Sequence, residues 1–247
     1  MKNISADLLE IFSSVQGEGK FVGTRQIFIR TTGCNLHCRY CDTNFHAGEF
    51  CKIETVPGEM IFRTIKNPVD AFQVAEVAKN FNEKIPHHSV SFTGGEPLLN
   101  PDFIFETAKL LKKSGLKIFL ETNATLPDAF EKNSDVVDIV SADIKLPGIV
   151  GKNFFDVHRE FFKLAAKKDL YVKIVLSDET PEEEFFSAVN LIAEVSPEIL
   201  LILQPVTPFN GLKKISPEKI LRFQSAALKI LKDVRVIPQT HRMMNVF

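Results

Sequence analysis

The chain has 247 residues, 45% of them hydrophobic and 25% charged, and its 30 basic and 31 acidic side chains give a net charge of −1. This composition is typical of a globular protein and excludes collagen-like, disordered and disulfide-rich classes. A charge near zero gives no support for a nucleic-acid or membrane-surface role. No apolar run is long enough to span a bilayer, and the first residues lack a secretory signal, so we expect a cytoplasmic protein.

Short apolar runs rich in Val, Ile and Phe recur along the chain and predict strands buried on both faces. Segments with apolar residues at helical spacing lie between some of them. The strands are expected at residues 26–31, 89–92, 117–121, 136–142, 171–176, 199–204 and 234–237, and two of the helices at 70–81 and 102–113.

Two further helices are predicted from the residues at their starts. Thr180 and Glu183 form a capping-box pattern around Pro181, and Ser216 precedes Pro217. Strands that alternate with helices imply βα units and a parallel sheet, so we expect an α/β fold.

The number of units favours a partial, open (β/α)6-type barrel with parallel strands. A Rossmann-like sheet is the competing architecture, but no G-x-G-x-x-G follows the first strand. Residues 44–68 contain glycines and prolines without firm periodicity, and we interpret them as an insertion in a single domain that spans 1–247.

The four cysteines are clustered rather than scattered along the chain. Cys34, Cys38 and Cys41 form C-x3-C-x2-C, and Cys51 follows soon after. In a reducing compartment such clustering indicates a metal site or a redox pair. A closed zinc site needs four ligands, with Cys51 or His37 as the fourth, whereas three cysteines on an iron–sulfur cubane leave one iron open for a ligand that undergoes chemistry.

Polar motifs follow the predicted strands, where functional residues of parallel βα proteins gather. The cysteine loop follows the first strand, and the other motifs are expected at the same rim. They are TGGEP (Thr93 to Pro97), ETN (Glu121 to Asn123), SADIK (Ser141 to Lys145) and QPVTP (Gln204 to Pro208). Two of these motifs have a plainer interpretation: the glycines of TGGEP can form an ordinary turn, and Asp143 and Lys145 of SADIK can form a solvated turn or a structural salt bridge.

The segment GCNLHCRYCDT, from Gly33 to Thr43, resembles the signature of the radical S-adenosylmethionine (SAM) superfamily, with Tyr40 at the aromatic position before the last cysteine. The resemblance implies a [4Fe–4S] cluster on Cys34, Cys38 and Cys41, with SAM chelating the open iron. It makes Cys51 a non-ligand. The SAM-binding residues that it implies are Tyr40, Cys41, Asp42, Gly94, Gly95, Glu96, Ser141, Ala142, Asp143, Lys145 and Gln204.

A second resemblance is more specific and covers nearly the whole chain. E-x-F-x-S-x-Q-G-E-G (Glu10 to Gly19), the CDT after the last cysteine, TGGEP, ETN and a C-terminal PQTH are similar to the 7-carboxy-7-deazaguanine synthase family. That family is implied to contract the ring of 6-carboxy-5,6,7,8-tetrahydropterin with loss of ammonia, in queuosine and archaeosine biosynthesis. The substrate residues that it implies are Val15, Gln16, Gly17, Glu18, Arg30, Thr93, Glu121, His241 and the terminal Phe247.

The same resemblance implies Mg²⁺ on the hydroxyl of Thr43, although a threonine there also suits a helix cap. It implies a homodimer and an electron donor such as flavodoxin or ferredoxin, with neither nucleic acid nor membrane as a partner. Two alternatives stay open at this stage: an activase of glycyl-radical enzymes, and a non-catalytic metal-binding module.

Overall fold

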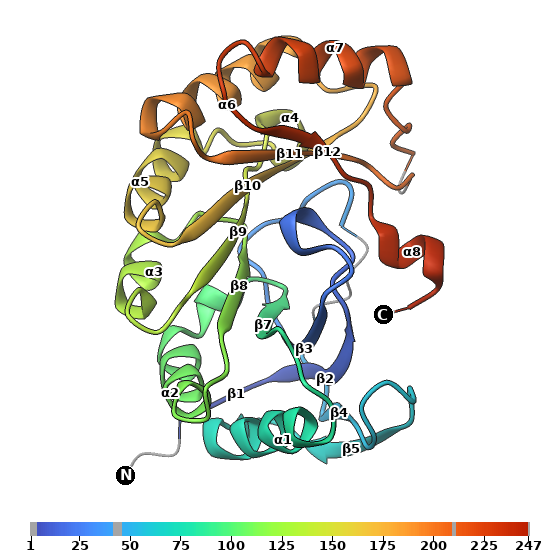
Figure 1. The fold of residues 1–247 in the computed structure, drawn as a ribbon, viewed down its shortest axis with the longest axis vertical. Coiled ribbons are helices and arrows are strands. Elements are labelled where there is room, and N and C mark those ends of the chain that lie inside the picture. Colours follow the sequence, from blue (N-terminus) through green and yellow to red (C-terminus); the bar gives the residue numbers. More distant parts are fainter. Residues whose placement is uncertain (1–3, 42–45, 209–210, 247) are drawn as a thin grey trace.

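A computed structural model describes residues 4–41, 46–208 and 211–246. Its main feature is a curved, open sheet with the strand order β12-β11-β10-β9-β8-β7-β3-β2-β4-β5. Figure 1 shows most of the helices following the outer side of this sheet, while the C-terminal helix α8 (Thr240–Met244) lies on its inner side. The expectation of an open α/β barrel is therefore confirmed.

The predicted strands form the parallel part of the sheet, with ends shifted by a few residues. These strands are β3 (Arg25–Thr31), β7 (Ser89–Gly94), β8 (Ile118–Thr122), β9 (Ile139–Asp143), β10 (Asp169–Leu176), β11 (Leu200–Pro205) and β12 (Val234–Val236). Their helix-facing side chains, such as Val90, Leu120 and Val172, are fully buried in the main core. Burial of apolar surface against the helices holds this layer together.

The helices connect these strands in chain order. They are α1 (Ala71–Lys84), α2 (Pro101–Lys112), α3 (Pro127–Asn133), α4 (Pro147–Val150), α5 (Phe155–Ala165), α6 (Glu182–Val195) and α7 (Pro217–Ala227). The cap predicted at Ser216 is confirmed, because its side chain accepts a hydrogen bond from the backbone N–H of Lys219. The prediction of a capping box at Thr180 was wrong, because Pro181 is the N-cap of α6. Thr180 Oγ1 instead accepts a hydrogen bond from the backbone N–H of Ser177.

Two segments without a strand prediction extend the sheet beyond β3. The first is β2 (Leu8–Val15), which runs antiparallel to β3. The second is a hairpin of β4 (Phe50–Glu54) and β5 (Phe62–Lys66) within the segment 44–68, and β4 pairs with β2. The segment therefore joins the main sheet as two strands. The short strands β1 (Ser5–Ala6) and β6 (Val69–Asp70) form a separate pair.

Candidate active site

The cysteine loop follows β3 and carries three free thiols. Cys34, Cys38 and Cys41 are all half-buried and line a cavity of about 140 Å³ together with Gly94 and Gly95. Burial raises the pKa of the Cys34 thiol, and it raises the pKa of Cys38 to about 11. Because thiolates are the metal-binding form, a positively charged metal group is needed to hold these side chains ionised. The donor set therefore fits a cluster with one iron left open.

Cys51 lies apart from these thiols. It is in β4, its side chain is fully buried in the main core, and burial raises its pKa to about 12. Among the residues that the structure describes, no three His, Cys, Asp or Glu side chains are grouped as ligands of a single metal ion.

A polar network ties the cysteine loop to the end of β8. Asn123 donates from Nδ2 to Asn35 Oδ1 at 2.8 Å and lies 4.0 Å from Cys34 Sγ. Asn35 donates in turn to Thr125 Oγ1 at 2.9 Å. The ETN motif marked this strand end, but only Glu121 was assigned a role from the sequence. Asn123 is thus a residue that orients the loop, and its position in the motif was the available signal.

The two glycines of TGGEP bring the end of β7 onto the cysteine loop. A Cβ at Gly95 would lie well under 3.0 Å from the carbonyl oxygen of Gly33, and a Cβ at Gly94 would overlap Thr31 O in the same way. The Glu96 N–H donates to Gly33 O at 2.8 Å. Both glycines line the cavity. The space that a side chain would need, however, is occupied by backbone atoms of Thr31 and Gly33. Their absent side chains permit contact between two loops.

Glu96 is fully buried behind that contact. Its oxygens accept from Thr122 Oγ1 at 2.8 Å, from Asn123 N at 2.7 Å and from Leu98 N at 3.0 Å. Burial raises its pKa to about 7. The carboxyl group thus hydrogen-bonds to neighbouring protein groups, and Glu96 lines neither the cysteine cavity nor the two cavities that adjoin it.

SADIK brings a charged cluster to the end of β9. Lys145 pairs with Asp143 Oδ2 at 2.7 Å and donates to Tyr40 OH at 2.9 Å. The buried imidazole of His158 bridges neighbouring strand ends, since its Nε2 accepts from Lys145 N and its Nδ1 faces Ala124 O. Ser141, Asp143 and Lys145 line the cysteine cavity, whereas the Ala142 side chain packs in the main core.

A second cavity of about 220 Å³ adjoins the first and shares Tyr40, Cys41, Gly94 and Asp143 with it. Two buried acceptors that border it, Asp143 Oδ1 and Gln204 Oε1, have no hydrogen-bond partner among the described residues. Buried polar atoms are normally satisfied, so this cavity is suited to a ligand that carries donors. The amino group and ribose hydroxyls of SAM are such donors, and the residues present therefore fit it.

Lys173 borders both of these cavities and had no role assigned from the sequence. Its ammonium group forms an ion pair with Glu18 of the QGEG segment and lies 3.8 Å from Asp143 Oδ2. Burial opposes ionisation of Glu18, but Lys173 outweighs it and the pKa falls to about 2. The available signal was a lysine inside the otherwise apolar strand β10, because lysine is rarely buried without a partner.

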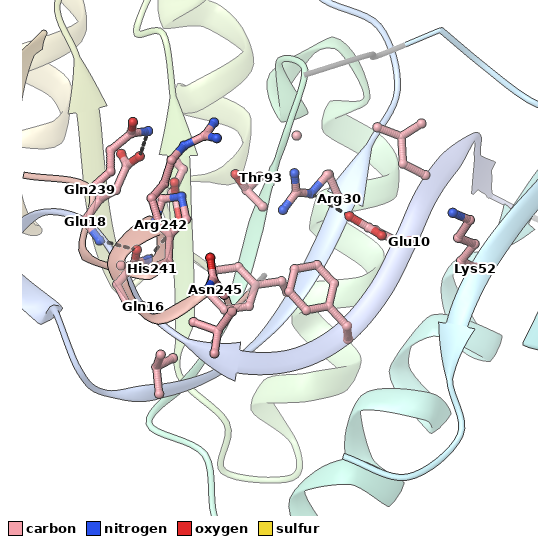
Figure 2. A pocket seen from close by; sticks show the side chains of 18 of the residues that line it. Glu10, Gln16, Glu18, Arg30, Lys52, Thr93, Gln239, His241, Arg242 and Asn245 are labelled. Atoms are coloured by element: carbon pink, nitrogen blue, oxygen red, sulfur yellow. Dashed lines mark hydrogen bonds and ion pairs between the residues drawn. The ribbon is translucent and has the colours of Figure 1, made fainter. Parts of the chain in front are cut away.

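A third cavity, of about 720 Å³ and the largest of these three, lies on the inner face of β2 and β3 and meets the other two at Gly94. Figure 2 shows Arg30 and Glu10 facing each other across these neighbouring strands. Their ion pair is 3.1 Å long, and the Arg30 guanidinium lies 5.4 Å from the centre of the Phe12 ring. Val15 and Thr93 also line this cavity.

Gln16 and Glu121 line the large cavity and hydrogen-bond to each other. Gln16 Nε2 donates to Glu121 Oε1 at 3.0 Å and to Gln26 Oε1 at 2.9 Å, while its own Oε1 accepts from Glu18 N. Ser91 donates to the same Glu121 Oε1 at 3.1 Å, and none of the described residues donates to Oε2, which is therefore available to a ligand. Burial raises the pKa of Glu121.

The C-terminal segment forms one side of this cavity. His241, Arg242 and Asn245 line it, and Gln239 Nε2 donates to Glu18 Oε1 at 2.7 Å (Figure 2). Thr240 N donates to Gly17 O at 2.8 Å. The expected residues Val15, Gln16, Gly17, Glu18, Arg30, Thr93, Glu121 and His241 therefore line one cavity. Asp42, Thr43 and Phe247 lie outside the described residues.

Comparisons with known proteins agree with this geometry. Residues 28–192 match the Radical SAM superfamily. The chain is 42% identical to a 7-carboxy-7-deazaguanine synthase of Geobacter sulfurreducens, with 99% of each chain covered. It is 34% identical to the synthase of Methanocaldococcus jannaschii, covering 96% of this chain and 98% of that protein. In fold it resembles the crystal structure of QueE from Escherichia coli, with a TM-score of 0.61 at 20% identity over 96% and 95% of the two chains.

Relatives that match end to end favour this family over a glycyl-radical activase or a non-catalytic metal module. Superfamily membership implies a [4Fe–4S] cluster and SAM as cofactors. The chain is therefore a radical SAM enzyme that belongs to the 7-carboxy-7-deazaguanine synthase family.

Proposed function

We propose that this enzyme converts 6-carboxy-5,6,7,8-tetrahydropterin to 7-carboxy-7-deazaguanine and ammonia, as a step of deazapurine biosynthesis. The observation that carries the proposal is the meeting of three cavities at Gly94, with the cysteines at one end, Arg30 at the other, and Glu121 lining both the cysteine cavity and the large cavity. Product and ammonia together contain the atoms of the substrate, so the conversion needs no net oxidant. When bound, the cluster and SAM supply the radical chemistry.

We assign the two smaller cavities to the cofactors. Cys34, Cys38 and Cys41 hold the cluster. Asp143 and Gln204 offer their free oxygens to donors of SAM, and Tyr40 and Ser141 border the same space. Lys145 holds Asp143 in place, because its ammonium lies 2.7 Å from the carboxylate.

We assign the large cavity to the pterin. Arg30 presents a planar guanidinium to the substrate carboxylate, and Phe12 beneath it keeps that group in place. Glu121 Oε2 accepts from the guanidine-like edge of the pterin. His241 covers the cavity from α8 and restricts the access of water.

Further proposals concern groups beyond these cavities. We assign Mg²⁺ to Thr43, in the loop that holds the cluster, where it would neutralise the substrate carboxylate. We also propose that residues 1–247 form one domain, that the enzyme is a homodimer in the cytoplasm, and that flavodoxin or ferredoxin reduces the cluster. Among the described residues no helix is long and apolar enough to cross a membrane.

Anaerobic reconstitution tests the proposed function. The protein is loaded with iron and sulfide, reduced, and incubated with SAM and 6-carboxy-5,6,7,8-tetrahydropterin. Mass spectrometry should detect 7-carboxy-7-deazaguanine and equimolar ammonia. Net consumption of SAM without a deazapurine product would contradict the proposal.

A further inference from the structure

Lys173 occupies an unusual place in the sheet. It lies in β10 between Tyr171 and Val175, which share its inward face, while the intervening residues pack against the helices. Its side chain is 9% exposed. Burial disfavours the charged form, but the carboxylates of Glu18, Asp143 and Glu121 raise the pKa above the usual lysine value. The ammonium group is therefore a permanent charge inside the cleft.

The two closest carboxylates line different sets of cavities. Glu18 is paired with the ammonium and lines the large cavity and the 220 Å³ cavity, whereas Asp143, at 3.8 Å, lines the two smaller cavities but not the large one. Glu18 comes from the N-terminal QGEG segment and Asp143 from the end of β9. One cation thus lies between a carboxylate that reaches the large cavity and a carboxylate that lines only the smaller two.

We propose that Lys173 is a positioning residue that keeps the pterin site and the SAM site in register, by anchoring Glu18 on one side and Asp143 on the other. This inference rests on the proposed function. Without the ammonium, Glu18 would lose its charged partner and Asp143 would keep only Lys145, at 2.7 Å, so no cation would join the two carboxylates. Reactions between bound groups depend on such alignment, because small displacements lower the rate steeply.

The test measures binding rather than turnover. Lys173→Met removes the charge and keeps much of the volume, and Lys173→Arg keeps the charge. The matched control is Lys20→Met: Lys20 pairs with Asp169 at 2.5 Å and so joins the same two segments, but at the surface. Isothermal titration of the cluster-loaded protein with SAM, and separately with 6-carboxypterin, gives both dissociation constants.

We expect Lys173→Met to weaken the binding of both ligands by about tenfold or more. Lys173→Arg should recover most of the affinity for each ligand, and Lys20→Met should bind both with the affinity of the parent. Unchanged affinity for either ligand in Lys173→Met would overturn the shared role. If Lys173→Met does not fold, as judged by thermal unfolding, Lys173→Gln serves the same comparison. Failure of the parent to bind 6-carboxypterin would instead contradict the proposed function.

Discussion

Gly17 lies directly against the imidazole of His241, so that a Cβ at position 17 would lie well under 3.0 Å from His241 Nδ1. The QGEG segment and the C-terminal helix therefore meet at a point that has no room for a side chain. Gly19 of the same segment meets the ring of Tyr171 in the same way, with φ of +66°. The spacing of the two glycines thus reflects two separate contacts.

We expect Gly17→Ala to displace His241 and loosen α8, and thereby to weaken binding of 6-carboxypterin by about tenfold or more. The cysteine loop is not part of this contact, so iron content and SAM affinity should match those of the parent. Titration with both ligands checks the prediction. Parent-like binding of 6-carboxypterin would show that α8 does not depend on this contact.

Replacement of single cysteines should separate ligands from core residues. Alanine at position 34, 38 or 41 should abolish the brown, oxygen-sensitive chromophore after reconstitution. Cys51→Ala should keep it, because Cys51 packs in the core within β4. Absorbance together with iron and sulfide analysis makes the comparison, and loss of the cluster in Cys51→Ala would refute the assignment.

Gly95→Ala should disturb the cysteine loop itself. The new methyl group would overlap the Gly33 carbonyl, so we expect the loop to shift and the iron content after reconstitution to fall. From the sequence alone, a side chain at position 95 is expected to block SAM and to leave the cluster intact. Iron analysis and SAM titration of the same variant distinguish these outcomes: full iron with lost SAM binding would support direct contact with the ligand.

His158 should make stability depend on pH. Burial lowers its pKa from 6.5 to about 4, so the folded protein holds it neutral while the unfolded chain takes up a proton below about pH 6.5. Its contribution is complete above pH 6.5 and is lost as the pH falls through 4, at up to about 1.4 kcal/mol per pH unit. His87 titrates in the same window.

Urea unfolding of the parent and of His158→Gln over this window measures the effect. Glutamine can keep both hydrogen bonds of the imidazole but does not titrate, so the variant should lose less stability on acidification. The part of the slope due to His87 should remain. Equal slopes in the two proteins would mean that His158 is not the group responsible.

The proposed Mg²⁺ site makes Thr43 testable by turnover. We expect Mg²⁺ to stimulate the reaction. Thr43→Ala should lose most of that stimulation, with a fall in turnover of about a hundredfold. Thr43→Ser should retain part of the stimulation. Cluster content and SAM binding should not change in either variant. If Thr43→Ala responds to Mg²⁺ as the parent does, the threonine is a structural cap.

Most of the parallel strands could be predicted because they are apolar runs buried on both faces; the edge strand β12, with its exposed Arg235, is the exception. The strand β2 could not, since its buried Ser13 and Ser14 interrupt the apolar pattern. In the hairpin, β5 has exposed residues at Arg63 and Thr64, so neither face gives a clear apolar signal. Strands near the edge of a sheet bury less surface, so their apolar pattern in the sequence is weaker.

The candidate site divides in a similar way. Motifs at strand ends could be located because topology brings the carboxyl ends of parallel strands to one rim. Lys173 and Asn123 could not be assigned, because their roles come from partners far away in the sequence. Glu18 is 155 residues from Lys173, and Asn35 is 88 residues from Asn123. Spacing within a motif contains no information about such pairs.

The contact between residues 239–246 and the QGEG segment can form only late in synthesis of the chain, because it joins segments that are far apart in the sequence. Glu18 and Gln239, which hydrogen-bond to each other, are separated by 221 positions. A nascent chain emerges from its N-terminus, so β3, the cysteine loop and the SAM-side strand ends are all made before the final turn of helix. The three thiols are therefore synthesised before the residues that form the C-terminal side of the large cavity, and a message truncated just before codon 239 would encode a protein that has the thiols but lacks that side of the cavity.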